Sequence, residues 1–89
     1  MRAIITVVGE DKVGIIAGIS AVLAEANVNI LDISQTTLQE YFTMMMMVDL
    51  SNLNTSMEKL KEQLKEKGKS LGVSVKLQHE DIFRSMHRI

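Results

Sequence analysis

The spacing of the apolar residues alternates between strand and helix periods along this chain, and the order of the changes limits its fold more than any other feature. Residues 3–8 are rich in β-branched side chains and are followed by Gly9, which is typical of a strand. After Gly14 the period becomes helical. One helical face then carries Ile15, Ile16, Ile19, Val22, Leu23 and Ala26. Asn27 follows this stripe and is suited to the left-handed conformation that ends a helix.

The second half of the chain repeats this alternation. Residues 30–38 and 41–50 are typical of strands, and Gln39-Glu40 between them is short enough for a two-residue hairpin turn. Thr55-x-x-Glu58 is a capping-box pattern, and the helix that it starts should end just before Gly72. One side of this helix carries Met57, Leu60, Leu64 and Leu71. Val73, Val75 and Leu77 alternate with polar residues, as in a half-buried strand.

The order strand, helix, strand, strand, helix, strand predicts an α+β fold of the ferredoxin-like kind. Right-handed crossovers place both helices on one face of a four-stranded antiparallel sheet, with the first and third strands in the centre. The tail also has helical spacing, at Ile82, Phe83, Met86 and Ile89, and predicts a short C-terminal helix. A chain of 89 residues can bury one core, so we expect residues 1–89 to form one domain.

Both central strands carry apolar residues on both of their faces. The pattern is clearest in the run from Met44 to Met47. If Phe42, Met44, Met46 and Val48 meet the helices, Met45 and Met47 lie on the face without helices. An exposed apolar face generally marks an interface, so we expect a second copy of the chain or the tail helix to cover it. Copper(I) binding by the methionines is an alternative. At most two of the four could share an ion, whereas packing accounts for all four.

Charge and composition exclude several classes of partner. Ten basic residues nearly balance eleven acidic ones, so no general field attracts nucleic acid or an anionic membrane. No stretch approaches the roughly 20 apolar residues that span a bilayer. The chain has no cysteine, which fits a reducing compartment, and we expect a cytoplasmic protein.

The segment from Gly9 to Ile15 is the candidate binding site. A helix begins after it, and the free N–H groups of a helix N-terminus attract a carboxylate or a phosphate. Gly14 would let a ligand approach the backbone closely. The same residues also fit an ordinary turn in which Asp11 is a helix cap, and the pattern by itself leaves both readings open.

The chain resembles the ACT domain family at these residues. The segment Asp11-Lys12-Val13-Gly14-Ile15, the helical stripe after it and the segment Asn27-Val28-Asn29-Ile30 are similar to the ACT signature in spacing and order. The resemblance is closest to stand-alone ACT proteins similar to the N-terminal domains of glycine-cleavage repressors and to the regulatory domains of formyltetrahydrofolate deformylases. Residues 82–86 of the tail also resemble the stand-alone group, so the similarity covers essentially the whole chain.

This resemblance implies a non-catalytic sensor that works as a homodimer and needs no cofactor. An amino acid would lie between the first loop of one subunit and the start of the second strand of the other. Asp11 and the backbone from Val13 to Ile15 would hold its charged groups, Asn29 of the partner would contact them, and Ile30 would shape the pocket. The implied ligand-binding residues are Asp11, Lys12, Val13, Gly14, Ile15, Asn29 and Ile30. A separate effector protein would receive the signal.

The resemblance also bears on the identity of the ligand. The serine-sensing members of the family have a histidine at the position of Gly9. Its absence here argues against serine as the ligand.

Other functions of this fold need residues that the chain lacks. An acylphosphatase-like enzyme needs an arginine in the first loop, which here carries Lys12, and His79 and His87 are far from that loop in the sequence. An RNA-binding module needs aromatic residues on one face of the central strands, whereas Tyr41 and Phe42 are adjacent and point to opposite faces. A metallochaperone needs paired cysteines. An assembly module without a metabolite is the alternative to the sensor.

Overall fold

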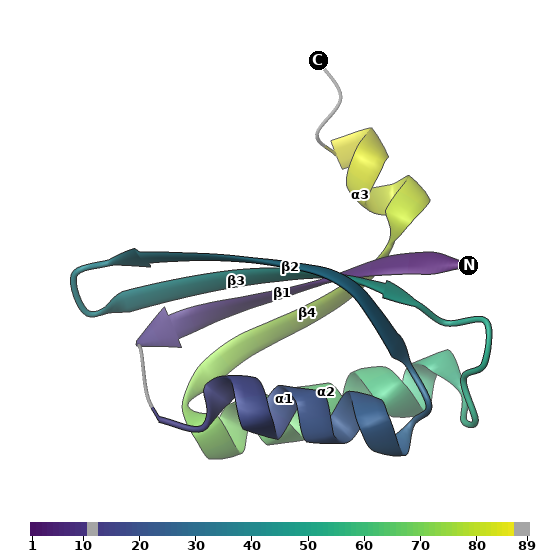
Figure 1. The fold of residues 1–89 in the computed structure, drawn as a ribbon, viewed down its shortest axis with the longest axis horizontal. Coiled ribbons are helices and arrows are strands. Elements are labelled where there is room, and N and C mark those ends of the chain that lie inside the picture. Colours follow the sequence, from purple (N-terminus) through teal and green to yellow (C-terminus); the bar gives the residue numbers. More distant parts are fainter. Residues whose placement is uncertain (11–12, 87–89) are drawn as a thin grey trace.

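The computed structural model describes residues 1–10 and 13–86 and has a four-stranded sheet with helices on both sides. Its elements are β1 (Arg2–Glu10), α1 (Ile15–Glu25), β2 (Asn29–Leu38), β3 (Tyr41–Asp49), α2 (Met57–Leu71), β4 (Val73–His79) and α3 (Glu80–Met86). Figure 1 shows α1 and α2 side by side below the sheet, whereas α3 stands on its other side. The predicted ferredoxin-like fold with a short C-terminal helix is confirmed.

The strand order is β2-β3-β1-β4, and every neighbouring pair is antiparallel. The prediction that the first and third strands are central is therefore confirmed. The predicted end of the first strand is wrong, because β1 continues through Gly9 to Glu10. Gly9 pairs with Phe42 on one side and with Val73 on the other. A Cβ atom at Gly9 would lie 2.7 Å from Cγ1 of Val73, so the glycine permits a close approach of β4 and does not end the strand.

The hydrophobic core lies between the sheet and the two helices α1 and α2. Met44 and Met46 are fully buried in it, together with Ile5 of β1 and Leu60 of α2. Antiparallel pairing places directly opposite residues on the same face, so Met45 and Met47 lie on the other face, as predicted. Ile16 departs from the predicted helical stripe, because its side chain is exposed to solvent.

The helix ends follow the sequence with one correction. Asn27 has a φ of 61° just after α1, and Gly72 has a φ of 74° just after α2, as the two predicted left-handed positions require. The predicted capping box at Thr55 is wrong. The N-cap of α2 is Ser56, whose Oγ accepts a hydrogen bond from the N–H of Lys59 at 3.1 Å. Ser56 and Thr55 can both cap a helix, and the chain enters α2 one residue later than the pattern indicates.

Helix α3 follows β4 without a loop and contacts both β1 and β4. Figure 1 shows it rising from the sheet on the side that α1 and α2 leave open. Ile82 on this helix is exposed. Two of the residues that were singled out in the tail, His87 and Ile89, lie outside the described residues.

Two helical glycines differ in what surrounds them, and this difference predicts opposite effects of alanine. A Cβ at Gly68 in α2 would lie 2.8 Å from the backbone oxygen of Val73, which cannot move without β4. A Cβ at Gly18 in α1 would meet the flexible end of Leu71 at 2.9 Å. Alanine favours a helix by up to about 1 kcal/mol over glycine, and overpacking costs roughly 1–3 kcal/mol.

We therefore expect Gly68→Ala to lower the free energy of unfolding by roughly 1–2 kcal/mol and Gly18→Ala to leave it unchanged or slightly raised. Urea denaturation of both variants at one protein concentration measures this. Equal effects of the two substitutions would contradict the packing of α2 on β4.

Candidate functional site

In the loop between β1 and α1, the two described residues, Val13 and Gly14, are exposed to solvent. Val13 is fully exposed, at 103% of the reference area, although it is apolar. Gly14 has a φ of 95°, and a Cβ there would meet nothing within 4 Å. Ile15 is buried in the core at 2% exposure and anchors the first turn of α1 through its side chain. Asp11 and Lys12 lie outside the described residues, so their part in this site stays a prediction.

The N-terminus of α1 lacks a side-chain cap in the part of the chain that the structure describes. Its N-cap is Gly14, which makes no side-chain hydrogen bond, and the first turn contains no acidic residue. By contrast, α2 begins with the capping hydroxyl of Ser56 and has Glu58 in its first turn. The first N–H groups of a helix carry a partial positive charge. The start of α1 is therefore suited to hold an anionic group.

The predicted site residues fall into two groups at opposite ends of the sheet. Asn29 pairs with Asp49, which pairs with Arg2 at the start of β1, whereas the loop follows Glu10 at its end. The nine residues of β1 separate these ends by about 26 Å. Asn29 is exposed and Ile30 is partly buried against the core. The loop and Asn29 of one chain therefore cannot hold the same small ligand.

Asn27, the other asparagine of the motif, has a structural role. Its Nδ2 donates to the backbone oxygen of Asn52 at 3.0 Å. Asn54 donates in return from its own Nδ2 to the backbone oxygen of Glu25 at 2.8 Å. These bonds join the end of α1 to the loop before α2. The sequence did not indicate these pairings, because the partners of the two bonds lie 25 and 29 residues apart.

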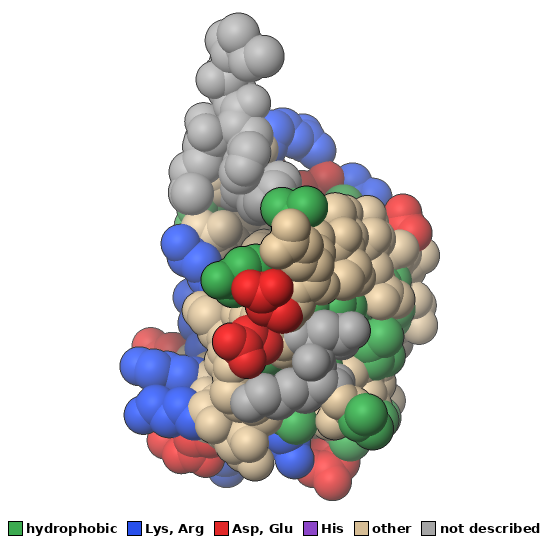
Figure 2. Space-filling model, turned by 90° about the vertical axis from the view of Figure 1, so that its left-hand side faces the viewer, with side chains coloured by type: hydrophobic (Ala, Val, Ile, Leu, Met, Phe, Trp, Pro, Cys, Tyr) green, Lys and Arg blue, Asp and Glu red, His purple; other side chains and the backbone are tan. Residues whose placement is uncertain are grey.

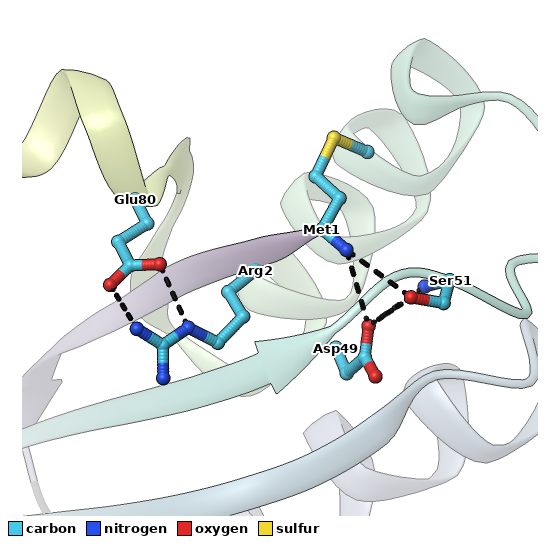
Figure 3. Close-up of polar contacts among 5 residues, drawn as sticks. All are labelled: Met1, Arg2, Asp49, Ser51 and Glu80. Carbon is cyan, nitrogen blue, oxygen red and sulfur yellow. Dashed lines mark hydrogen bonds and ion pairs between the residues drawn. The ribbon is translucent and has the colours of Figure 1, made fainter.

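Two polar contacts hold the end of the sheet that is far from the loop (Figure 3). The Arg2 guanidinium donates from Nε to Oε2 of Glu80 at 2.8 Å and from Nη2 to Oε1. This hydrogen-bonded pair lowers the pKa of Glu80. Ser51 donates to Asp49 from its hydroxyl at 2.6 Å and from its backbone N–H at 3.0 Å, which lowers the pKa of Asp49. The contact with Glu80 attaches the start of α3 to β1.

Helix α1 and strand β2 form an unusually uncharged side of the molecule. Residues 15–24 of α1 and 33–38 of β2 contain no charged side chain, and β2 is exposed along nearly its whole length. Figure 2 looks at the end of the molecule where the β2–β3 hairpin turns: charged side chains gather at the lower left, and much of the right side is green or tan. A helix that is apolar all round is normally covered by another surface.

The face of the sheet that α1 and α2 do not cover is called here the open face, and its two ends differ. At one end lies a shallow niche of about 190 Å³. The residues that line this niche are Ile4, Asp32, Ser34, Met45, Met46 and Met47. At the other end an apolar ridge projects into solvent, formed by Val8, Leu38 and Tyr41, of which Leu38 is 71% and Tyr41 56% exposed.

Neither a metal centre nor a membrane span is found in the described ranges. Among residues 1–10 and 13–86, His, Asp and Glu side chains do not gather into a group that could hold a metal ion. None of the helices in those ranges has the length and apolar character needed to cross a bilayer.

A family model described as the ACT domain matches residues 2–78 of the chain, from β1 into β4. The chain belongs to the ACT domain family. It is 64% identical to a UPF0237 protein of Clostridium acetobutylicum over 89 residues, which cover 100% of both chains. It is also similar to the solved structure of an ACT domain protein from Streptococcus pneumoniae, with a TM-score of 0.80 and 48% identity over 93% of each chain.

Two more distant structures share the fold of this ACT domain. A putative glycine cleavage system transcriptional repressor superposes with a TM-score of 0.72 at 23% identity, over 86% of this chain and 44% of that one. A formyltetrahydrofolate deformylase from Pseudomonas putida superposes with a TM-score of 0.80 at 12% identity, over 91% of this chain and 30% of that one. The predicted resemblance to both kinds of protein is confirmed.

The Arg2–Glu80 contact predicts how the attachment of α3 depends on pH. The folded pKa of Glu80 is lowered, so the contact stabilises the structure above the ordinary carboxyl pKa and is lost as the pH falls through the folded value. We expect the backbone amides of α3 to exchange hydrogen faster at acid pH, after correction for the intrinsic rate, and Glu80→Gln to cause this at neutral pH.

Asp81→Asn is the matched control, because it removes a neighbouring carboxylate from the first turn of the same helix. Equal exchange in α3 for the Glu80 and Asp81 variants would show that the ion pair does not hold this helix.

Proposed function

We propose that this ACT domain is a non-catalytic regulatory module that binds an amino acid between two copies of itself. The observation that carries the proposal is the start of α1, which has no side-chain cap among the described residues and lies beside an exposed Gly14 with open space around it. A carboxylate of the ligand accepts hydrogen bonds from the N–H groups there, and Asp11 holds its ammonium group. Binding of both charged groups selects a zwitterion over a simple anion.

The second half of the site comes from a partner chain. In one chain about 26 Å separates the loop from Asn29, far more than an amino acid spans. Asn29 of the partner supplies a side-chain amide for the charged groups, and Ile30 of the partner, which is partly buried, shapes the apolar wall of the pocket. The ligand then joins two subunits, so its binding changes how firmly they are held together.

The outer edge of β2 is the surface that brings these groups together. An edge strand with free N–H and C=O groups pairs readily with another strand. β2 has ten residues, and its residues 33–38 lack the charges that block such pairing. A two-fold axis joins two β2 strands in antiparallel order, so the start of one meets the end of the other.

This pairing places Asn29 of the partner beside Leu38 at the hairpin end of the sheet. Leu38 pairs with Tyr41, and Tyr41 pairs with Glu10, after which the binding loop begins. The separation between the partner's Asn29 and Glu10 is then three strand spacings, or about 14 Å, instead of about 26 Å within one chain. The ligand lies within this distance, next to the chain that follows Glu10. The uncharged outer face of α1 meets the same face of the partner's α1.

The position of Gly9 limits how the site recognises a ligand. A larger residue at position 9 would push against Val73, because a Cβ there already lies 3.1 Å from the Val73 Cα. Residue 9 therefore contributes no side chain to the ligand, and the binding groups come from the backbone, Asp11 and the partner. The regulatory signal passes to a separate effector protein through the change in subunit contact.

A thermal-shift screen across the twenty amino acids tests this function. A ligand at 100 times its dissociation constant stabilises the folded protein by about 2.7 kcal/mol, which raises the melting temperature by roughly 10 °C or more. We expect one or a few amino acids to produce this shift and both Asp11→Ala and Asn29→Ala to abolish it. Asn52→Ala is the control, because Asn52 is also exposed and lies outside the site.

A wild-type protein that melts cooperatively and shows no shift with any amino acid would contradict the sensor and favour an assembly module of the same fold. A shift that survives both Asp11→Ala and Asn29→Ala would place the ligand elsewhere on the molecule.

A further inference from the structure

The niche and the ridge of the open face lie at different points along the strands. Met47 in the niche pairs with Ile4, and Tyr41 in the ridge, six residues earlier in β3, pairs with Glu10. Met47 and Tyr41 are therefore about 20 Å apart. Ile4, which stands outside the main core, is 8% exposed in the niche, whereas the ridge projects into solvent. One end of the face is hollow and the other end is raised.

We propose that a second copy of the chain covers the open face, with the ridge of each copy in the niche of the other. The two-fold axis lies between the two stacked sheets, parallel to their planes and perpendicular to the strands. It stacks each strand on the same strand of the partner and exchanges the two ends of the face. Tyr41 of the partner then lies over Met47, and Leu38 of the partner lies near Asp32.

The polar groups of the niche suit a tyrosine. Asp32 and Ser34 line the niche beside the methionines. Asp32 Oδ1 accepts a hydrogen bond from its neighbour, the Ile33 N–H, at 2.9 Å, which leaves the other carboxylate oxygen for the partner's Tyr41 hydroxyl. The tyrosine ring covers the thioethers of Met45 and Met47, a favourable contact for sulfur and an aromatic ring. The niche therefore matches both the apolar body and the polar tip of Tyr41.

Helix α3 selects this axis over the other two-fold arrangement of stacked sheets. It stands on the open-face side, next to the end of β4 and the start of β1 (Figure 1). An axis parallel to the strands would bring the start of the partner's β2 against α3. The perpendicular axis reverses the strand direction of the partner, so α3 lies beyond the end of the partner's sheet and does not meet its strands. The same axis keeps the two Asp32 carboxylates about 20 Å apart, so they do not repel each other across the contact.

The area of this contact indicates its strength. Four strands spaced about 4.8 Å apart and about seven residues long cover roughly 440 Å² on each copy, or about 900 Å² in total. Stable interfaces usually bury about 1,200–2,000 Å². The contact is therefore a weak one, and we expect it to dissociate as the protein is diluted. This contact does not need the amino-acid ligand.

Thiol cross-linking tests the proposal directly, because the chain has no cysteine of its own. Tyr41→Cys and Met47→Cys are made in separate chains, mixed in equal amounts and treated with a short bismaleimide linker. We expect dimers that contain one chain of each kind, because stacked sheets hold the two Cα atoms about 10 Å apart, within reach of the linker but beyond the roughly 7 Å that a direct disulfide allows. Each variant alone should link poorly, because equivalent residues lie about 20 Å apart across the axis. Tyr41→Cys mixed with Glu62→Cys, an exposed position on α2, measures random collisions.

Analytical ultracentrifugation without cross-linking gives the second measurement, the dissociation constant of the contact. We expect Met45→Glu, in the niche at the middle of β3, to weaken the association across the open face at least tenfold while the thermal response to amino acids stays unchanged. Glu62→Ala is the control. Linking of Tyr41→Cys with Met47→Cys no faster than with Glu62→Cys would overturn the proposal. If no amino acid shifts the melting temperature of the wild type while Tyr41→Cys and Met47→Cys link as expected, the proposed ligand site is contradicted and this contact is not.

Discussion

The antiparallel pairing of β1 with β3 is the constraint on which the rest of this structure depends. The two strands pair along their whole length, from Arg2 with Asp49 to Glu10 with Tyr41. One face of the pair forms the floor of the core, where Ile5 and Met46 pack beneath the helices. The same pairing sets the length of the sheet. It thereby separates the loop before α1 from the start of β2, so a site that uses both must be shared between chains.

The fold could be predicted from the sequence because each element has a local cause. The change from β-branched runs to helical stripes indicates the order of elements, and Asn27 and Gly72 end the helices in the left-handed conformation. The errors occur where local pattern is ambiguous. Thr55 and Ser56 can both cap a helix, and Gly9 ends a strand as readily as it admits a close neighbour. The contact with Val73, distant in sequence, decides the second case.

The candidate site was predictable only in part, for a related reason. Gly14 could be identified because a glycine before a helical stripe has a local signature, and the structure gives it a left-handed conformation with open space. The absence of a side-chain cap on α1 depends on geometry within the described residues and has no sequence pattern. The contact of Arg2 with Glu80 joins residues 78 positions apart and has no local signal. The niche and the ridge likewise require the register of β1, β2 and β3.

A complementation experiment tests most directly whether the ligand site is shared between two chains. Asp11→Ala and Asn29→Ala are mixed in equal amounts, and the stoichiometry of the amino acid with the largest thermal shift is measured by calorimetry. Half of the dimers in the mixture contain one chain of each variant, and each of these has one intact site of two. The account therefore predicts recovery of about a quarter of the wild-type sites. No recovery above the two separate variants, under conditions where the chains exchange, would contradict it.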